Sequence, residues 1–128
     1  MLSVEKYYEM LALNKALMEV RFLGGDIDVA LRGSAPLADL HSRLIDELID
    51  HHRRSGEDGK VASWEQWRVF ASRGLEIQSI IGYFSPMWSG IKSETVKRQA
   101  LEAQMRPFIF DDGDVDRLYQ EIERRARG

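Results

Sequence analysis

The 128-residue chain contains no cysteine. This absence excludes disulfides, zinc–thiolate sites, iron–sulfur clusters and thiol nucleophiles. The chain also lacks any run close to the roughly 18 apolar residues that a membrane-spanning helix requires. Near the N-terminus, charged residues such as Glu9, Lys15 and Glu19 interrupt the apolar positions, unlike the apolar core of a secretory signal. We therefore expect a cytoplasmic protein with no membrane partner.

The chain has no basic excess either. Its 18 lysines and arginines are outnumbered by 21 aspartates and glutamates, which gives a formal net charge of -3. A domain that neutralises nucleic-acid phosphates ordinarily carries a positive balance, so this composition argues against a nucleic-acid partner. The sequence also contains no glycine-rich nucleotide-binding fingerprint and no G-x-S-x-G nucleophile motif. These patterns predict no cofactor and no catalytic residue.

Helical periodicity dominates the rest of the sequence. Hydrophobic residues make up 44% of the chain and charged residues 30%, as is typical of a globular domain. The spacing of apolar residues, together with serine and proline start signals, predicts about five helices. They cover residues 3–23, 34–54, 63–84, 85–105 and 111–128. We therefore expect an all-α fold in which residues 1–128 form one compact, bundle-like domain.

The segments between these helices are less clearly defined. We expect an irregular connection over residues 26–35 and a flexible loop over residues 55–62, which contain two glycines and mixed charges. Ser63 and Gln66 match a capping box and predict that the third helix begins there. Gly74 leaves open whether residues 65–84 form one helix or two.

The acidic segment near the C-terminus partly matches a calcium-binding loop. Asp112, Asp114, Asp116 and Glu123 occupy positions 1, 3, 5 and 12 of an EF-hand loop. Such a loop turns sharply at a glycine in position 6, where this chain has Arg117. The segment therefore predicts the acidic start of a helix, which interacts favourably with the helix dipole.

All three histidines fall in the helix predicted over residues 34–54. A zinc site on a helix usually combines two histidines about four residues apart with a further ligand. His41 and His52 share a face, but they are roughly 16 Å apart along the axis, and the adjacent His51 and His52 point about 100° apart. We therefore predict hydrogen-bonded structural histidines rather than a metal site, and the sequence leaves open whether any metal binds near them.

Aromatic residues are concentrated in the third quarter of the chain. Interleaved with basic residues, they can stack on nucleobases or bind an aromatic or anionic ligand. Residues 57–110 hold seven basic and six acidic residues, too small an excess for a nucleic-acid surface. We predict that the aromatic residues belong to the core and to an interface. The candidate interface or ligand-binding residues are Trp64, Trp67, Arg68, Tyr83 and Trp88.

The helix predicted over residues 3–23 carries apolar residues on two adjacent faces. This stripe is wider than packing against one core requires. With the tryptophan content, it supports the hypothesis of a non-enzymatic protein-interaction module that forms a homodimer or binds a protein partner. One alternative is a small-ligand-binding helical domain with an aromatic pocket near the tryptophans. A metal-dependent hydrolase ranks last because no ligand spacing supports it.

Overall fold

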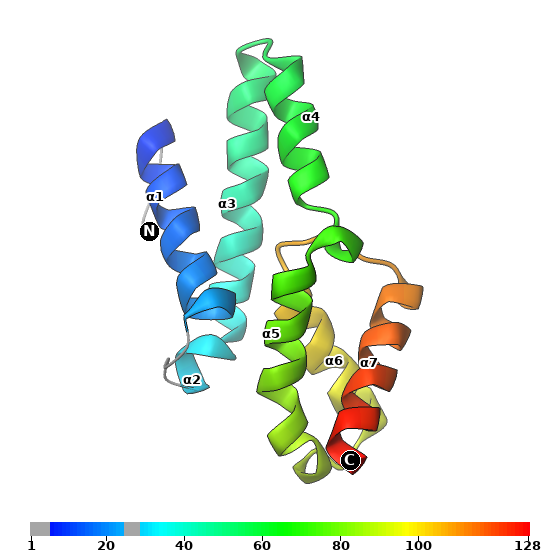
Figure 1. Ribbon diagram of the computed structural model, residues 1–128. Helices are drawn as coiled ribbons and strands as arrows, with labels where there is room; N and C mark the ends of the chain where they lie inside the picture. Colours follow the sequence, from blue (N-terminus) through cyan, green and yellow to red (C-terminus); the bar gives the residue numbers. More distant parts are fainter. Residues whose placement is uncertain (1–5, 25–28) are drawn as a thin grey trace.

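The computed structural model describes residues 6–24 and 29–128 and has an all-α fold, as predicted (Figure 1). The described ranges contain seven α-helices: α1 (Tyr7–Met18), α2 (Val29–Arg32), α3 (Ala35–Arg54), α4 (Asp58–Trp67), α5 (Gly74–Phe84), α6 (Glu94–Met105) and α7 (Asp112–Arg127). A π-helical turn, Glu19–Leu23, extends α1, and 3-10 turns cover Phe70–Ser72 and Ser85–Gly90. The α-helices outnumber the predicted five because residues 65–84 span two helices and residues 26–35 contain α2. Residues 3–5, where the first predicted helix begins, lie outside the described residues.

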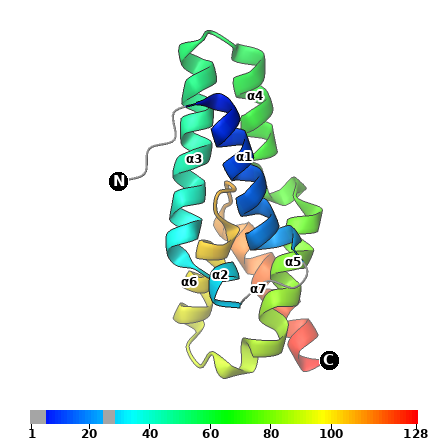
Figure 2. The ribbon, with the colours of Figure 1, turned by 90° about the vertical axis from the view of Figure 1, so that its left-hand side faces the viewer.

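The helices form two groups. Helices α1, α3 and α4 lie side by side in one group, and α5, α6 and α7 form the other (Figures 1 and 2). Each group has its own hydrophobic cluster. The first is built on Met10, Leu17, Leu44, Ile45, Leu48 and Ile49, and the second on residues that include Ile80, Trp88, Leu101, Phe108 and Ile122. Trp67 packs against both clusters, so it lies where the two groups meet.

Helix α3 follows its sequence signals closely. The Ser34 hydroxyl accepts a hydrogen bond from the Leu37 amide at 3.3 Å, and Pro36 lies in the first turn, where no amide hydrogen is needed. The helix ends at Arg54, as expected. Its apolar face is buried, and Ile45 and Leu48 have no exposed surface. Local capping and apolar spacing agree here, so the sequence predicts the element correctly.

Two predicted boundaries are wrong. The expected flexible loop over residues 55–62 is only a short turn, because α4 begins at Asp58 and contains Ser63 in its interior. The Glu57 carbonyl accepts hydrogen bonds from the Lys60 and Val61 amides and starts the helix despite Gly59. The helix expected from residue 85 begins only at Glu94, where the Ser93 hydroxyl caps it.

The C-terminal predictions hold more closely. The end of the fourth predicted helix at Arg106–Pro107 is confirmed, since α6 stops at Met105. The acidic segment is the start of α7, where the carboxylate of Asp111 and that of Asp114 each bind the other residue's backbone amide. The segment therefore forms a capped helix start, as predicted, and not an EF-hand loop. Beyond α6, Phe108 is buried in the core, whereas Ile109 is 62% exposed.

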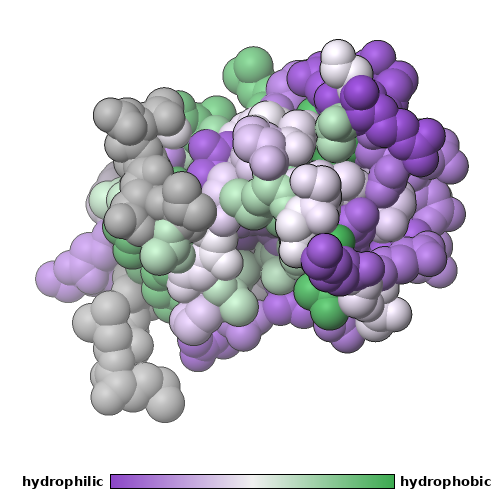
Figure 3. Space-filling view, turned by 90° about the horizontal axis from the view of Figure 1, so that it is seen from below, coloured by the Kyte–Doolittle hydropathy of each residue, from purple (hydrophilic) through white to green (hydrophobic). Residues whose placement is uncertain are grey.

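In the view from below, the described residues show no single broad apolar patch (Figure 3). Hydrophilic residues gather on the side of α7, and the hydrophobic patches are small and separated. Within the described ranges, no helix combines the length and the hydrophobicity needed to cross a bilayer.

Candidate functional site

The structure divides the predicted aromatic site residues among separate places. Trp64 and Trp67 lie on α4 with their rings 5.2 Å apart, both half-buried. Trp88 is only 2% exposed and lies in the second hydrophobic cluster. Tyr83, on α5, packs against Arg32 and lines a different hollow. These aromatic side chains therefore do not line one common pocket.

Trp88 is tied to its surroundings by polar contacts. Its indole N–H donates a hydrogen bond to the Glu123 carboxylate at 2.8 Å, and Lys97 lies 4.7 Å from the centre of its ring. Lys97 also pairs with Glu123 at 3.3 Å. These contacts connect the 3-10 turn, α6 and α7. Trp88 is thus a core residue with a satisfied donor, consistent with part of the aromatic content serving the core.

Arg68 holds three segments together at the end of α4. Its guanidinium donates to the Pro107 carbonyl at 2.6 Å, to the Asp46 carboxylate at 2.6 Å and to the Ser42 carbonyl at 3.3 Å. Its side chain is 11% exposed. Beside it is a hollow of about 600 Å³, which we call the α3–α4 hollow. The hollow is lined by Asp46, Ile49, Asp50, Arg53, Glu65, Arg68, Val69 and Ile109.

His41 belongs to a buried hydrogen-bond network. An arginine side chain only donates, so Arg21 Nη1, at 2.9 Å, must donate to His41 Nδ1. His41 Nε2 then carries the proton and donates to Asn14 Oδ1 at 2.7 Å. Burial, with the charges of Arg21 and Arg68, lowers the pKa of His41 to about 3. His41 is therefore a hydrogen-bonded structural histidine, as predicted for this helix.

Arg21 is buried although its hydrogen-bond partners include no carboxylate. Its guanidinium donates to the carbonyls of Arg106, Ala103 and Gln104, at the C-terminal end of α6. Those carbonyls lack helical partners and carry the negative end of the helix dipole, which favours a cation. Burial, followed by the charge of Arg106, lowers the pKa of Arg21 to about 10. Arg21 therefore joins the end of α1 to α3 and α6.

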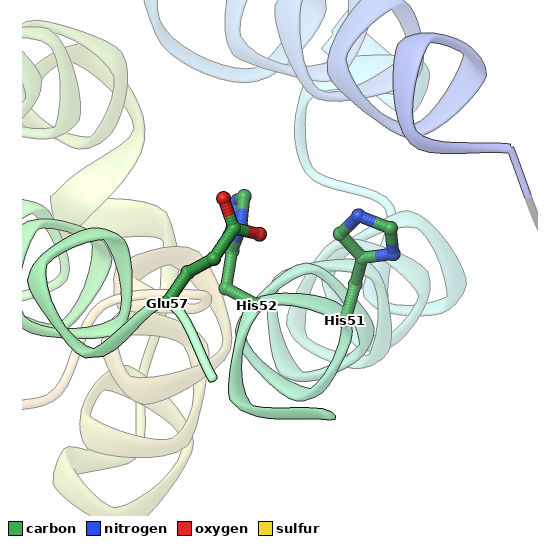
Figure 4. A group of neighbouring side chains, drawn as sticks. All are labelled: His51, His52 and Glu57. Carbon is green, nitrogen blue, oxygen red and sulfur yellow. The ribbon is translucent and has the colours of Figure 1, made fainter. Parts of the chain in front are cut away.

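The other two histidines lie at the opposite end of α3. His51, His52 and Glu57 each offer one potential ligand atom, and these atoms lie within 4.8 Å of one another. Figure 4 shows all three side chains pointing to the same side of the turn between α3 and α4. His52 Nδ1 lies 3.1 Å from Glu57 Oε1, and the Tyr7 ring stacks on His51 at 5.1 Å. We call this group the His–His–Glu cluster.

Sequence reasoning missed three of the residues that define these sites. Arg21 follows the pattern of an ordinary charged helix residue, and nothing in the sequence marks it as buried. Glu57 lay in a segment interpreted as a flexible loop, although a carboxylate shortly after two histidines and a glycine turn is a usable signal. Tyr7 reaches the histidines only through the packing of α1 on α3.

Comparisons with protein-family models, with curated proteins and with solved structures find no significant match.

Proposed function

We propose that this protein is a non-enzymatic interaction module that associates with a second copy of itself through the α3–α4 hollow. The observation that carries the proposal is a pair of exposed apolar side chains in its lining. Val69 is 38% exposed and Ile109 is 62% exposed. The Ile109 amide donates to the Arg68 carbonyl at 2.7 Å, and the Phe70 amide donates to the Ile109 carbonyl at 3.0 Å. The two side chains are therefore presented on an ordered backbone.

The charges around the hollow suit a second copy of the same surface. A two-fold interface brings one patch against itself, so the patch must be self-complementary. The rim carries three acidic residues, Asp46, Asp50 and Glu65, and two basic residues, Arg53 and Arg68. Arg53 already pairs with Asp50 and Glu65, and Arg68 pairs with Asp46. The patch thus combines two exposed apolar side chains with nearly balanced charge, and two copies repel each other little.

The wide apolar stripe of the first helix gives this proposal less support than the sequence indicated. Leu11, Leu13 and Leu17 pack against the first hydrophobic cluster or belong to it, so the monomer covers much of this stripe. Tyr8 is 81% exposed. The hollow, rather than α1, is therefore the surface on which we centre the interface.

The experiment is sedimentation velocity over a series of micromolar concentrations, comparing wild type with Ile109→Asp. The matched control is Leu75→Asp, which changes an apolar residue that is 75% exposed on α5. We expect concentration-dependent dimers for wild type and the control, and monomers for Ile109→Asp. A wild-type protein that stays monomeric throughout the series, or an Ile109→Asp variant that still dimerises, would contradict the proposal.

A second candidate function is binding of a small apolar ligand beside Tyr83. The observation that favours it is a hollow of about 320 Å³, a volume within the range of small-molecule sites. Met87, Ile91 and Ala100 contribute apolar lining. Ala100→Trp should fill this space and abolish binding of an apolar fluorescent dye. Dye binding that is equal in the variant and in wild type would exclude this hollow as the site.

A further inference from the structure

The turn between α3 and α4 places two imidazoles and one carboxylate together. His51 and His52 occupy the last turn of α3, and Glu57 directly precedes α4. Gly56, with a φ of 70°, adopts the left-handed conformation that lets the chain reverse there. The Glu57 amide donates to the His52 carbonyl at 2.9 Å, which holds the carboxylate close to the imidazole. The proximity of these groups is thus a product of the local backbone.

The donor set and its spacing suit a transition metal. Imidazole nitrogen and carboxylate oxygen are ordinary zinc ligands, at about 2.0–2.1 Å from the ion. Tetrahedral ligands at that distance lie roughly 3.3 Å apart. The separation of 3.1 Å between His52 Nδ1 and Glu57 Oε1 is close to this value, and His51 is half-buried, so a ring rotation can bring its nitrogen nearer.

A second observation at the cluster is an unsatisfied nitrogen. His52 is 1% exposed, and its Nε2 has no hydrogen-bond partner among the described residues. No bond at Nε2 therefore determines which ring nitrogen carries the proton. A neutral His52 with the proton on Nε2 directs the lone pair of Nδ1 toward Glu57, where an ion would be shared.

The surroundings hold the ligands in place. Tyr7 stacks on His51 with its ring centre 5.1 Å away and meets the His52 ring edge-on at the same distance. Lys60 binds the second oxygen of Glu57 at 3.0 Å. The positive charge of Lys60 opposes a cation, whereas the negative end of the α3 dipole favours one.

We propose that His51, His52 and Glu57 bind one zinc ion, with at least one coordination position left for water or an exogenous ligand. The ion would lie at the turn between α3 and α4, far along the chain from Ile109, the residue that tests self-association. It does not rest on self-association through the α3–α4 hollow.

The test is isothermal titration calorimetry, in which zinc chloride is titrated into tag-free protein that has been treated with a chelator and then freed of it. We expect one ion per chain for wild type and at least tenfold weaker binding for His51→Gln, His52→Gln and Glu57→Gln. Asp58→Asn is the matched control, because it removes a neighbouring acidic residue outside the cluster and should leave the affinity within about twofold. Cobalt absorption then reports the ligand geometry for wild type.

Circular dichroism shows whether each variant remains folded. His51 is half-buried, so His51→Gln decides the matter even where replacement of the buried His52 disrupts folding. Absence of zinc binding by wild type would overturn the proposal, and so would unchanged affinity in folded His51→Gln and Glu57→Gln.

Discussion

Acidification from pH 7 to pH 5 should destabilise this protein through His41, and the carboxylates of the protein contribute little to that change. The pKa of His41 falls from an ordinary 6.5 to about 3 on folding, because the ring is buried beside Arg21 and Arg68. Above pH 6.5 both states are neutral at this residue, and it has no effect on stability. Below pH 6.5 the unfolded chain binds a proton that the folded protein does not. Stability therefore decreases as the pH falls toward about 3.

The size of the effect follows from these two pKa values. Integrating proton binding between pH 7 and pH 5 gives a loss of about 2 kcal/mol in the free energy of unfolding. Glu57, Glu121 and Glu123 have pKa values lowered from 4.5 by their hydrogen-bond partners. Their contribution is present above pH 4.5 and is lost as the pH falls below it, so it changes little in this window.

The assay is urea denaturation at pH 7, 6 and 5 for wild type and His41→Gln. We expect the variant to be less stable at every pH, because the hydrogen bonds of the imidazole with Arg21 and Asn14 are lost. Its stability should nevertheless fall by about 2 kcal/mol less than that of wild type between pH 7 and pH 5. His51 and His52 are present in both proteins, so their effects cancel in this difference. Equal losses in the two proteins would refute the assignment to His41.

Three further substitutions test the packing and polar contacts, each by urea denaturation at pH 7. Leu48→Ala opens a cavity in the first hydrophobic cluster and should cost about 2–5 kcal/mol; a cost below 1 kcal/mol would contradict its full burial. Arg21→Met leaves the α6 carbonyls without their donor and should cost about 3 kcal/mol or more. Ser34→Ala removes the α3 cap and should cost about 1 kcal/mol. Its control, Ser89→Ala, replaces an exposed serine in the 3-10 turn Ser85–Gly90 and should cost less than about 0.5 kcal/mol.

The histidines show how far sequence reasoning reaches at a site. The axial separation predicted for His41 and His52 holds, because it depends only on helix geometry, and the two residues belong to different groups of contacts. The 100° angle predicted between His51 and His52 did not lead to the His–His–Glu cluster. Their side chains at the end of α3 nevertheless point to the same side, and their rings lie 5.2 Å apart. Glu57 completes the cluster through a turn whose sequence was interpreted as flexible.

The tryptophans show the same limit in the core. Their position in the third quarter of the chain suggested a shared surface, but Trp88 follows α5, while Trp64 and Trp67 belong to α4. Trp64 packs against the first hydrophobic cluster, Trp88 belongs to the second, and Trp67 contacts both. Arg73 lies over the Trp67 ring at 4.9 Å. Composition locates aromatic residues along the chain, whereas helix packing decides which of them meet.

Sequence patterns alone predict the all-α class, the cap and end of α3, the end of α6 before Pro107 and the acidic start of α7. These features depend on apolar periodicity and on hydrogen bonds between residues close in the chain, so local chemistry is sufficient. The three-dimensional packing was needed to see that Arg21 is buried, that His41 is neutral, that His51 and Glu57 converge on His52, and that Ile109 is exposed. The features of Arg21, His41 and Ile109 depend on contacts between segments far apart in the chain, which apolar periodicity does not reveal. The cluster at His52 depends on the path of the turn between α3 and α4.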